Sequence, residues 1–311
     1  MSEITIKKKR KRPFRQLLAH FRNPVTMKEL RSRMRGRRAF VVLTLYLFMV
    51  SGFISLIYVA AVNSGNRSGA QSRDVGRIIF SSVVGIQTFL VLFVGPSFTA
   101  GSISGEKERQ TFDLLRTTLL TADSFVMGKM LSALSYVLLL IFAAIPLQSI
   151  AFLLGGISFL ELFLSQLILV VGAIAVAMFG LYCSAVMRST MGASVVTFAG
   201  ILFVTAGIPA LTALFGAIVS PLFISGSLSS IPGEVWAYLG ILLAATNLPA
   251  TLIVSDLFLL QDGFYFAGST TVSGSGSAYL VSPWPLFLLF YLLLAFLLYK
   301  LTVRRIRKVA E

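Results

Sequence analysis

Seven long stretches of this chain contain no Asp, Glu, Lys or Arg, and this feature restricts the fold more than any other. They are residues 39–66, 78–105, 130–160, 162–187, 189–233, 235–255 and 263–299. A helix that crosses a hydrocarbon core of about 30 Å, at about 1.5 Å per residue, needs about 20 predominantly apolar residues. Each stretch is long enough, so the sequence predicts an all-α integral membrane protein.

The overall composition agrees with this class. Hydrophobic residues make up 56% of the 311 residues, and charged residues make up only 13%. A soluble domain carries about 25% charged residues because its surface must face water. Most of the surface of this chain must therefore face something else. The one cysteine, Cys183, excludes an intrachain disulfide.

Trimming the charge-free stretches to their apolar centres predicts a six-span helical bundle within a transmembrane domain of residues 39–303. The predicted spans are residues 39–62, 78–100, 126–153, 162–187, 192–218 and 284–303. The stretch 235–255 is long enough to cross, but Asn247, Pro249 and Asp256 interrupt or close it. It is therefore not counted as a span.

The basic residues favour six crossings over seven. With six, 24 of the 27 Lys and Arg lie on one side, 14 of them within residues 1–38. Lys and Arg are concentrated in cytoplasmic loops, so both ends of this multi-pass chain are predicted to be cytoplasmic, in a plasma or inner membrane. Residues 219–283 contain no Lys or Arg and form the predicted outer loop. Its apolar pieces are expected to be re-entrant or interfacial, and its Gly-, Ser- and Thr-rich part, 267–277, a low-complexity loop.

Residues 23–38 have the pattern of an amphipathic elbow helix. Asn23 and Pro24 suit an N-cap and a first helical position. The apolar stripe consists of Met27, Leu30 and Met34. A basic amphipathic helix of this kind lies in the plane of the lipid headgroups. The alternative is a solvated cationic arm.

Basic tails, residues 1–22 and 304–311, flank the predicted membrane segments. The run Lys7–Arg12 resembles a nucleic-acid-binding patch. Charge runs beside a first span more often lie near anionic lipid headgroups. The expected partner of the tail is therefore the lipid bilayer, and no nucleic acid.

The chain lacks the groups that most enzymes use. Its only histidine is His20, which excludes a His-based catalytic or zinc site. The nearest match to a phosphate-binding loop, at Gly128-Lys129, has Asp123 where the first Gly belongs. No enzymatic activity, metal or cofactor is therefore expected in this chain. No charged residue falls in the middle of the five best spans, which disfavours an ion-coupled carrier without excluding one.

The segment between the second and third spans has an ordered pattern. Its charged residues gather at its start, and an apolar stripe of helical spacing follows, formed by Phe112, Leu115 and Leu119. Thr121 or Asp123 can cap the next span. Two interpretations stay open: an interfacial helix resting on lipid, or a ledge that docks a cytosolic partner.

In this segment the sequence resembles the permeases of type-2 ATP-binding-cassette (ABC) exporters, whose signature follows the second span. The matching residues are Ile103, Glu106, Glu108, Thr111, Asp113, Leu114, Leu115, Thr117, Gly128 and Lys129. That family shows an acidic-basic cluster, Gly-Thr, an acidic residue, Leu-Leu, Thr-Pro and then Gly-Lys. Here Gln110 replaces the usual Gly, Asp113 the commoner Glu, and Thr118 the Pro.

The resemblance implies that the cytoplasmic coupling segment, residues 102–124, contacts an ABC ATPase subunit that binds ATP and Mg²⁺. The implied contact residues are Glu106, Glu108, Arg109, Thr111, Asp113, Leu114 and Leu115. It also implies a second permease copy or paralogue, and an outer lid formed by Asn247, Pro249 and Asp256. The expected function is the permease subunit of an ATP-driven exporter. The alternatives are a membrane assembly or docking protein without transport, and a secondary carrier.

Overall fold

The protein folds as an all-α bundle, and its described residues include six helices long and apolar enough to cross a membrane, which confirms the predicted fold class. The computed structural model describes residues 37–63, 71–111, 121–224, 233–261, 266–272 and 276–310. Within these ranges, the six candidate spans are Phe40–Ala60, Arg73–Glu108, Ala122–Leu153, Phe159–Val186, Thr190–Ala217 and Pro283–Arg307. The predicted elbow stripe of Met27, Leu30 and Met34 lies outside the described residues.

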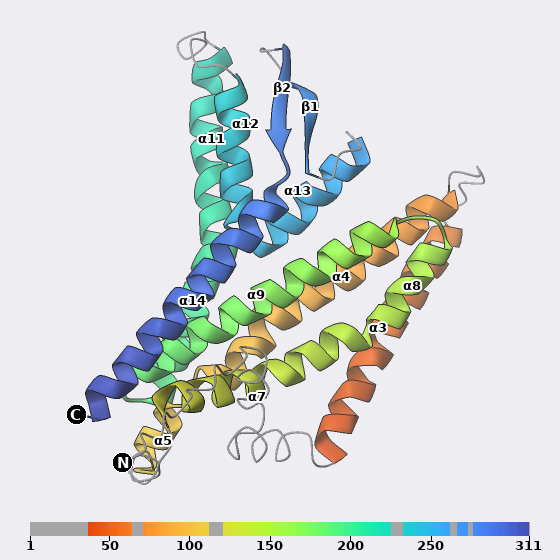
Figure 1. Ribbon diagram of the computed structural model, residues 1–311. Coiled ribbons are helices and arrows are strands. Elements are labelled where there is room, and N and C mark those ends of the chain that lie inside the picture. The colour runs from red at the N-terminus through yellow and green to blue at the C-terminus, as the bar shows by residue number, and fades with distance from the viewer. Residues whose placement is uncertain are drawn as a thin grey trace, which may run out of the picture.

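The spans are built from ten helical elements, most of which are labelled in Figure 1. They are α3 (Arg37–Asn63), α4 (Gln71–Thr99), α5 (Ser104–Glu108), α7 (Ala122–Ala143), α8 (Ile145–Leu153), α9 (Phe159–Val186), α10 (Thr190–Leu202), the π-helical turn η1 (Phe203–Gly207), α11 (Ile208–Ile224) and α14 (Pro283–Ala310). The last helix continues to Ala310, so most of the predicted tail 304–311 extends α14.

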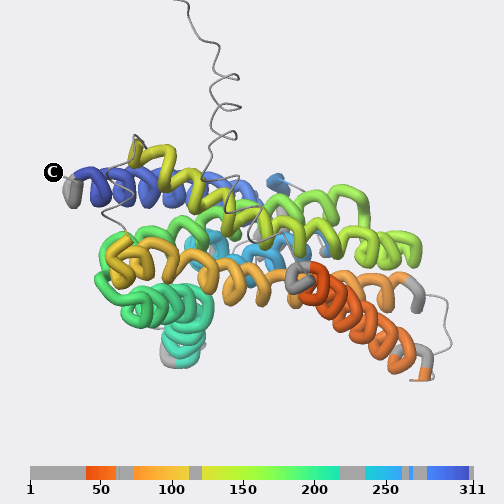
Figure 2. Tube along the Cα trace, turned by 90° about the horizontal axis from the view of Figure 1, so that it is seen from below, coloured from red at the N-terminus to blue at the C-terminus, as the bar shows by residue number. Residues whose placement is uncertain are grey.

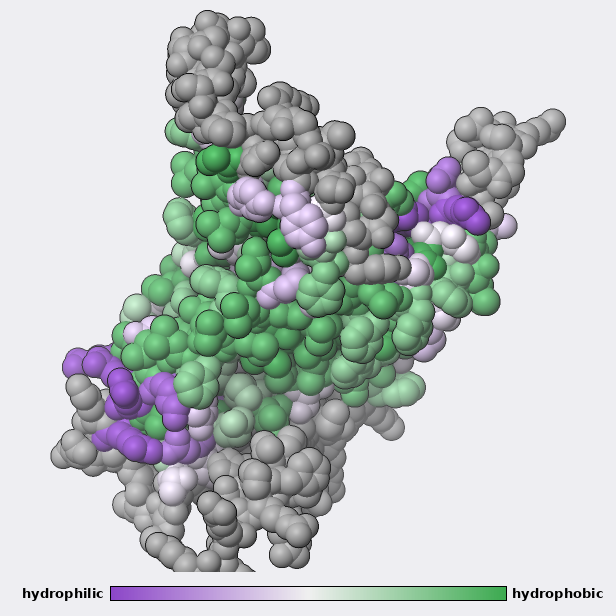
Figure 3. Space-filling view, turned by 45° about the horizontal axis from the view of Figure 1, so that its top comes forward, coloured by the Kyte–Doolittle hydropathy of each residue, from purple (hydrophilic) through white to green (hydrophobic). Residues whose placement is uncertain are grey.

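The bundle has two polar ends and an apolar middle. Figure 3 shows apolar side chains over the middle of the visible face, with hydrophilic ones gathered toward two ends. One end, here called the α5 end, holds α5, the start of α7, the start of α10 and the end of α14. The other, here called the hairpin end, holds the start of α4, the start of α9 and the start of α14 (Figure 1). An apolar belt between two polar rims is the pattern of a membrane-spanning bundle.

Helix α9 is the centre of the bundle and packs against α14, α4, α7 and α10. Figure 2 shows α4 running alongside it. Small residues allow this close packing: a Cβ at Gly172 would lie 2.1 Å from Leu248 Cδ1, and one at Gly180 would lie 2.2 Å from Thr99 Oγ1. Small residues let membrane helices approach closely where lipid offers no hydrophobic driving force. In α9 both glycines serve contacts within the chain.

Prolines break two of the spans at defined points. Pro146 stands at the second position of α8 and separates it from α7 at Ala144. Pro209 follows η1, where the fifth span changes from α10 to α11. A proline has no N–H and leaves a carbonyl in the preceding turn without its helical partner. Inside a membrane such a carbonyl needs another donor, and at Pro209 the side-chain amide of Asn247 supplies it.

The doubtful stretch 235–255 does not form a span. It divides into α12 (Gly233–Ala245) and α13 (Leu248–Gln261), of 13 and 14 residues. At 1.5 Å per residue each is about 20 Å long, too short to cross about 30 Å of hydrocarbon. Helix α12 descends from the hairpin end and α13 returns toward it (Figure 1). The chain therefore enters the bundle and turns back, as a re-entrant piece does.

A small β-hairpin replaces the loop expected at 267–277, so that expectation was wrong. Strands β1 (Ala267–Val272) and β2 (Gly276–Val281) pair antiparallel, with Ala267 opposite Val281. Leu280 is buried against Ile241 of α12, and the Tyr238 hydroxyl donates to the Tyr279 carbonyl. Contacts with α12 thus stabilise a hairpin that Gly and Ser content alone does not favour.

Candidate functional site

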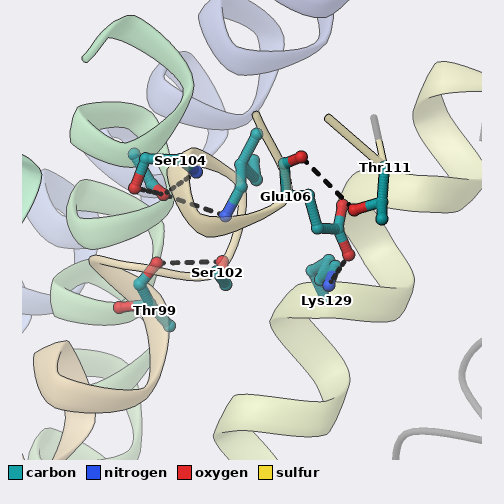
Figure 4. A network of polar contacts seen from close by, with 8 residues as sticks. Thr99, Ser102, Ser104, Glu106, Thr111 and Lys129 are labelled. Atoms are coloured by element: carbon teal, nitrogen blue, oxygen red, sulfur yellow. Dashed lines mark hydrogen bonds and ion pairs between the residues drawn. The ribbon is translucent and has the colours of Figure 1, made fainter. Parts of the chain in front are cut away.

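One serine of α9 fixes the start of α5. Ser184 Oγ accepts hydrogen bonds of 2.9 Å from the backbone N–H groups of Ile103 and Ser104 and lies 3.2 Å from Ser104 Oγ. All three residues are completely buried. The first turn of a helix leaves N–H groups without helical acceptors, and Ser184 satisfies them from the neighbouring helix. Helix α5 therefore begins in a fixed position against α9, close to Ser104 in Figure 4.

An ion pair connects α5 to α7. Glu106 Oε1 lies 2.5 Å from Lys129 Nζ, as Figure 4 shows. The side chains of Lys129 and Glu106 are only 8% and 22% exposed. Removing one partner of a pair this well shielded would leave the other charge uncompensated. The Gly128-Lys129 pair noted in the sequence thus contributes its lysine to the position of α5.

The other two charges of α5 bind opposite helix termini. Lys107 Nζ donates to the carbonyls of Ala185 and Met187 at the end of α9. The Glu108 carboxylate accepts from the Thr190 backbone N–H at 2.8 Å and from its hydroxyl at 2.9 Å, at the start of α10. The C-terminus of a helix carries a partial negative charge and the N-terminus a partial positive one. Lys107 at the C-terminus of α9 and Glu108 at the N-terminus of α10 therefore complement the two partial charges.

The structure therefore places Glu106 and Glu108 in contact with their own chain. Arg109 and Thr111 follow them and are exposed at the α5 end. The Thr111 hydroxyl donates to the Glu106 carbonyl at 3.3 Å, also visible in Figure 4. The remaining predicted contact residues, Asp113, Leu114 and Leu115, lie outside the described residues. Binding of an ATPase by this segment stays a prediction.

The start of α7 is tied to the end of α14. Thr121 caps α7, accepting a hydrogen bond of 3.4 Å from the Ser124 N–H, which confirms the cap predicted at this residue. Asp123 does something else: its carboxylate accepts from the Arg307 guanidinium and, at 3.3 Å, from the Tyr299 hydroxyl. The α5 end thus joins α5, α7, α9, α10 and α14 through polar side chains.

Helices α12 and α13 form a helical hairpin, here called the re-entrant hairpin. Asn247 lies at its tip, between the two helices, and binds it to the broken fifth span. Its Nδ2 donates hydrogen bonds of 3.0 Å to the carbonyls of Val204 and Thr205. Pro209 lies four residues after Thr205 and five after Val204, so it cannot donate to either carbonyl. Asn247 takes the place of the missing N–H. This predicted lid residue is 2% exposed.

Further hydrogen bonds hold the tip within the bundle. The Tyr291 hydroxyl donates to the Thr246 carbonyl at 2.7 Å, and the Thr251 hydroxyl donates to the Ala244 carbonyl at 2.8 Å. Tyr291 stands about 12 Å along α14 from Pro283, at 1.5 Å per residue. The tip therefore reaches well into the apolar part of the bundle, shielded by protein as re-entrant backbone must be.

The other two predicted lid residues line a cavity. Pro249 and Asp256 of α13 face a space of about 550 Å³ between α4, α9 and α13. Asp256 Oδ1 lies 2.8 Å from Arg77 Nη2 of α4, and the same nitrogen lies 3.9 Å from Glu161 Oε1 of α9. This ion triad joins the three helices at the hairpin end.

A buried amide network deeper in the bundle was missed by the sequence reasoning, which searched the spans for charged residues only. Gln148 Nε2 donates to Gln87 Oε1 at 2.8 Å, and Gln166 Nε2 donates to Gln148 Oε1 at 2.8 Å. Gln87 Nε2 donates to the Ile141 carbonyl at 2.9 Å, just before the break at Pro146. Three glutamines within apolar spans were the available signal, since polar groups in lipid are kept only where they find partners.

Among the described residues, no group of three or more His, Cys, Asp or Glu side chains could hold a metal ion. No model of a known protein family matches the chain, and no curated protein matches it at a significant level. A function must therefore be argued from the contacts of the α5 end and of the re-entrant hairpin.

Proposed function

We propose that this chain is the membrane-spanning permease subunit of an ABC transporter, working as an exporter with a separate ATPase subunit that binds ATP and Mg²⁺. One observation carries the proposal: α10 is attached at its start to α5 and, through η1, to the tip of the re-entrant hairpin. A permease driven from one face needs such a connection. The resemblance in residues 103–129 supports the same function.

The first step of the proposed mechanism is movement of α5. When partner ATPases close on ATP, they would displace the segment around α5. Glu108 would pass that displacement to Thr190, and Lys107 to the end of α9. Energetic coupling over such distances is carried by rigid helices and by hydrogen bonds with more than one stable arrangement. Helix α10 is a continuous rod between Thr190 and η1.

The second step is release of the re-entrant hairpin, α12 and α13, from α4. Movement of η1 would shift Asn247, which starts α13, and α13 carries Asp256. The ion pair between Asp256 and Arg77 closes the hairpin against α4. Its separation would open the cavity toward the hairpin end and let cargo leave. Alternating access of this kind requires a second permease half, a copy of this chain or a paralogue.

The proposal includes an orientation. The α5 end faces the cytoplasm, and the hairpin end faces outside a plasma or inner membrane. The count of basic residues supports it, because 24 of 27 lie on the α5 side when six helices cross. The surface offered to the ATPase includes Arg109 and Thr111, whose side chains are exposed. The ion pair between Glu106 and Lys129 fixes the position of α5, next to this surface.

Purification of the tagged chain from its own cells in mild detergent tests the proposal. We expect an ATPase with a phosphate-binding loop to co-purify and to hydrolyse ATP. Reversing the exposed charge in Arg109→Glu should lower its co-purification about ten- to hundredfold, the effect of losing a charge pair worth about 1–3 kcal/mol at an interface. The matched control is Arg73→Glu, which reverses an exposed arginine at the hairpin end and should leave the complex intact.

The alternatives give different results in the same preparation. Flux that follows an ion gradient and needs no nucleotide, with no ATPase bound, would make the chain a secondary carrier. A stable partner without a phosphate-binding loop, and no flux in reconstituted vesicles, would make it a docking or assembly protein. Equal co-purification of the ATPase with Arg109→Glu and Arg73→Glu would remove the α5 end as the ATPase surface.

A further inference from the structure

The cavity between α4, α9 and α13 has the size and lining of a binding site for a small molecule. Its volume is about 550 Å³, within the 300–1,000 Å³ that is typical of such sites. Aliphatic and aromatic side chains of all three helices make most of the lining, among them Phe80, Leu164 and Leu252. A few polar groups stand at one end. Mostly apolar walls with a few convergent polar groups suit an amphiphile.

The charged groups that line the cavity, among the described residues, are both acidic. They are Glu161 and Asp256. Arg77 lies beside both carboxylates but does not line the cavity. One guanidinium against two carboxylates leaves this end of the cavity with a net negative charge. In a site of low dielectric constant, this charge favours a cationic ligand group.

A buried hydroxyl beside Asp256 has no hydrogen-bond partner among the residues that the structure describes. Ser255 lines the cavity and is 6% exposed, and no described residue forms a hydrogen bond with its Oγ. A buried hydroxyl without a partner costs about 1–3 kcal/mol, and a helical serine usually avoids this cost by bonding the carbonyl one turn earlier. Because less than 1 Å² of the Oγ atom is accessible, a ligand head in the cavity would supply the missing partner once the Ser255 side chain rotates toward it.

The cavity opens sideways through the apolar belt. Three lining residues of α4, Ser81, Gly85 and Phe89, follow one another at four-residue spacing and are exposed. Across from them Ile253 of α13 is 61% exposed. A Cβ at Gly85 would meet nothing within 4 Å. An amphiphile dissolved in the membrane could therefore enter between α4 and α13 without crossing water.

We propose that this cavity binds a single-chain amphiphile with a protonated amine head. The amine lies by Asp256, Glu161 and Ser255, and the alkyl chain lies along the apolar lining between α4 and α9. A volume in the range of small-molecule sites favours one chain over the two of a phospholipid. The proposal stands on the cavity and its charge, and it holds whether or not the chain is a transporter.

Photolabelling of the full chain in phosphatidylcholine nanodiscs tests it, with two probes that carry the same diazirine-bearing decyl chain. One probe ends in an amine and the other in a sulfonate. The amine probe should label peptides of α4 and α13, and unlabelled decylamine should compete. Gly85→Leu, which places a side chain at the open face of the cavity, should lower labelling about tenfold. The matched control is Gly52→Leu on α3, an exposed helical glycine with nothing within 4 Å of its Cβ position.

Asp256→Asn tests the charge directly. It removes one carboxylate and frees Arg77, so labelling by the amine should fall about threefold to tenfold and labelling by the sulfonate should rise. Equal labelling by both probes in the unaltered chain would overturn the amine head. Equal labelling of Gly85→Leu and Gly52→Leu would overturn the cavity as the site. Loss of labelling when phosphatidylethanolamine replaces a third of the lipid would make the occupant a two-chain lipid and overturn the single-chain assignment.

Discussion

The side-chain amide of Asn247 donates a 3.0 Å hydrogen bond to the carbonyl of Thr205, 42 residues earlier in the chain. The acceptor is the carbonyl that Pro209 leaves without a helical donor. One contact therefore does two things. It supplies a donor to a carbonyl of the broken fifth span, and it fixes the depth to which the re-entrant hairpin enters the bundle.

We expect Asn247→Ala to destabilise the protein by about 1–3 kcal/mol, the cost of leaving buried carbonyls without a donor. The measurement is thermal unfolding in detergent, followed by a thiol-reactive fluorophore. Cys183 is the only cysteine and is 5% exposed, so its reaction reports opening of α9. Asn63→Ala, at an exposed position on α3, is the control and should leave the midpoint unchanged. An equal midpoint for both variants would contradict the role of Asn247.

The pair Glu108 and Thr190 should be energetically coupled. The carboxylate caps the start of α10 from a different element, and such a contact at an exposed helix N-terminus is worth about 0.3–1 kcal/mol. Glu108→Ala and Thr190→Ala should each destabilise the protein by amounts of this order. Their effects should not add, because either change removes the same hydroxyl contact. Additive effects in the same unfolding measurement would show that the two residues act independently.

Much of the fold could be predicted because its cause is local. Spans follow from uninterrupted apolar stretches, and the six predicted spans match the six found. The break at Asn247 and Pro249 could be recognised for the same reason, since a proline and a polar side chain mark it in the sequence. The β-hairpin could not be predicted, because Leu280 and Tyr279 are held by α12, some 40 residues away.

The candidate site was harder to predict, because its contacts are not local. Glu106 and Glu108 were expected to face a partner, and their spacing gave no sign of their actual neighbours. Lys129 is 23 residues from Glu106, and Thr190 is 82 residues from Glu108. Only the packing of α5 between α7, α9 and α10 brings these groups together. The glutamine network was missed because the spans were searched for charged residues only, and because Gln87 and Gln148 lie 61 residues apart in the chain.

Replacing either of two glycines of α9 by alanine should destabilise the protein, by an amount that depends on the atoms around that glycine. At Gly180 the new Cβ would lie 2.2 Å from Thr99 Oγ1, 3.1 Å from Thr99 Cβ and 3.4 Å from the Ala100 nitrogen. At Gly172 the close atom is Cδ1 of Leu248, the end of a side chain that can rotate. We expect a loss of about 1–3 kcal/mol for Gly180→Ala and a smaller loss for Gly172→Ala.

The control for these variants is Gly52→Ala on α3, where a Cβ meets nothing within 4 Å. Alanine in an unobstructed helix gains about 0.5–1 kcal/mol over glycine, so this variant should be more stable than the unaltered chain. Unfolding midpoints measured through Cys183 provide the comparison. A Gly180→Ala variant as stable as Gly52→Ala would mean that α9 and α4 are not packed as closely as described.

The last prediction concerns the direction in which the bundle faces. Thr111 is exposed at the α5 end, and Tyr279, 63% exposed, lies on β2 at the hairpin end. With six crossings these positions are expected on opposite sides of the membrane, and the excess of Lys and Arg at the α5 end predicts that this end is cytoplasmic. In a Cys183→Ser background, a membrane-impermeant maleimide should label Tyr279→Cys in intact cells. It should label Thr111→Cys only after the cells are opened. Labelling of both positions in intact cells would contradict the six-span topology. Labelling of Thr111→Cys alone in intact cells would keep six spans but invert them, and the α5 end could not then meet a cytosolic ATPase.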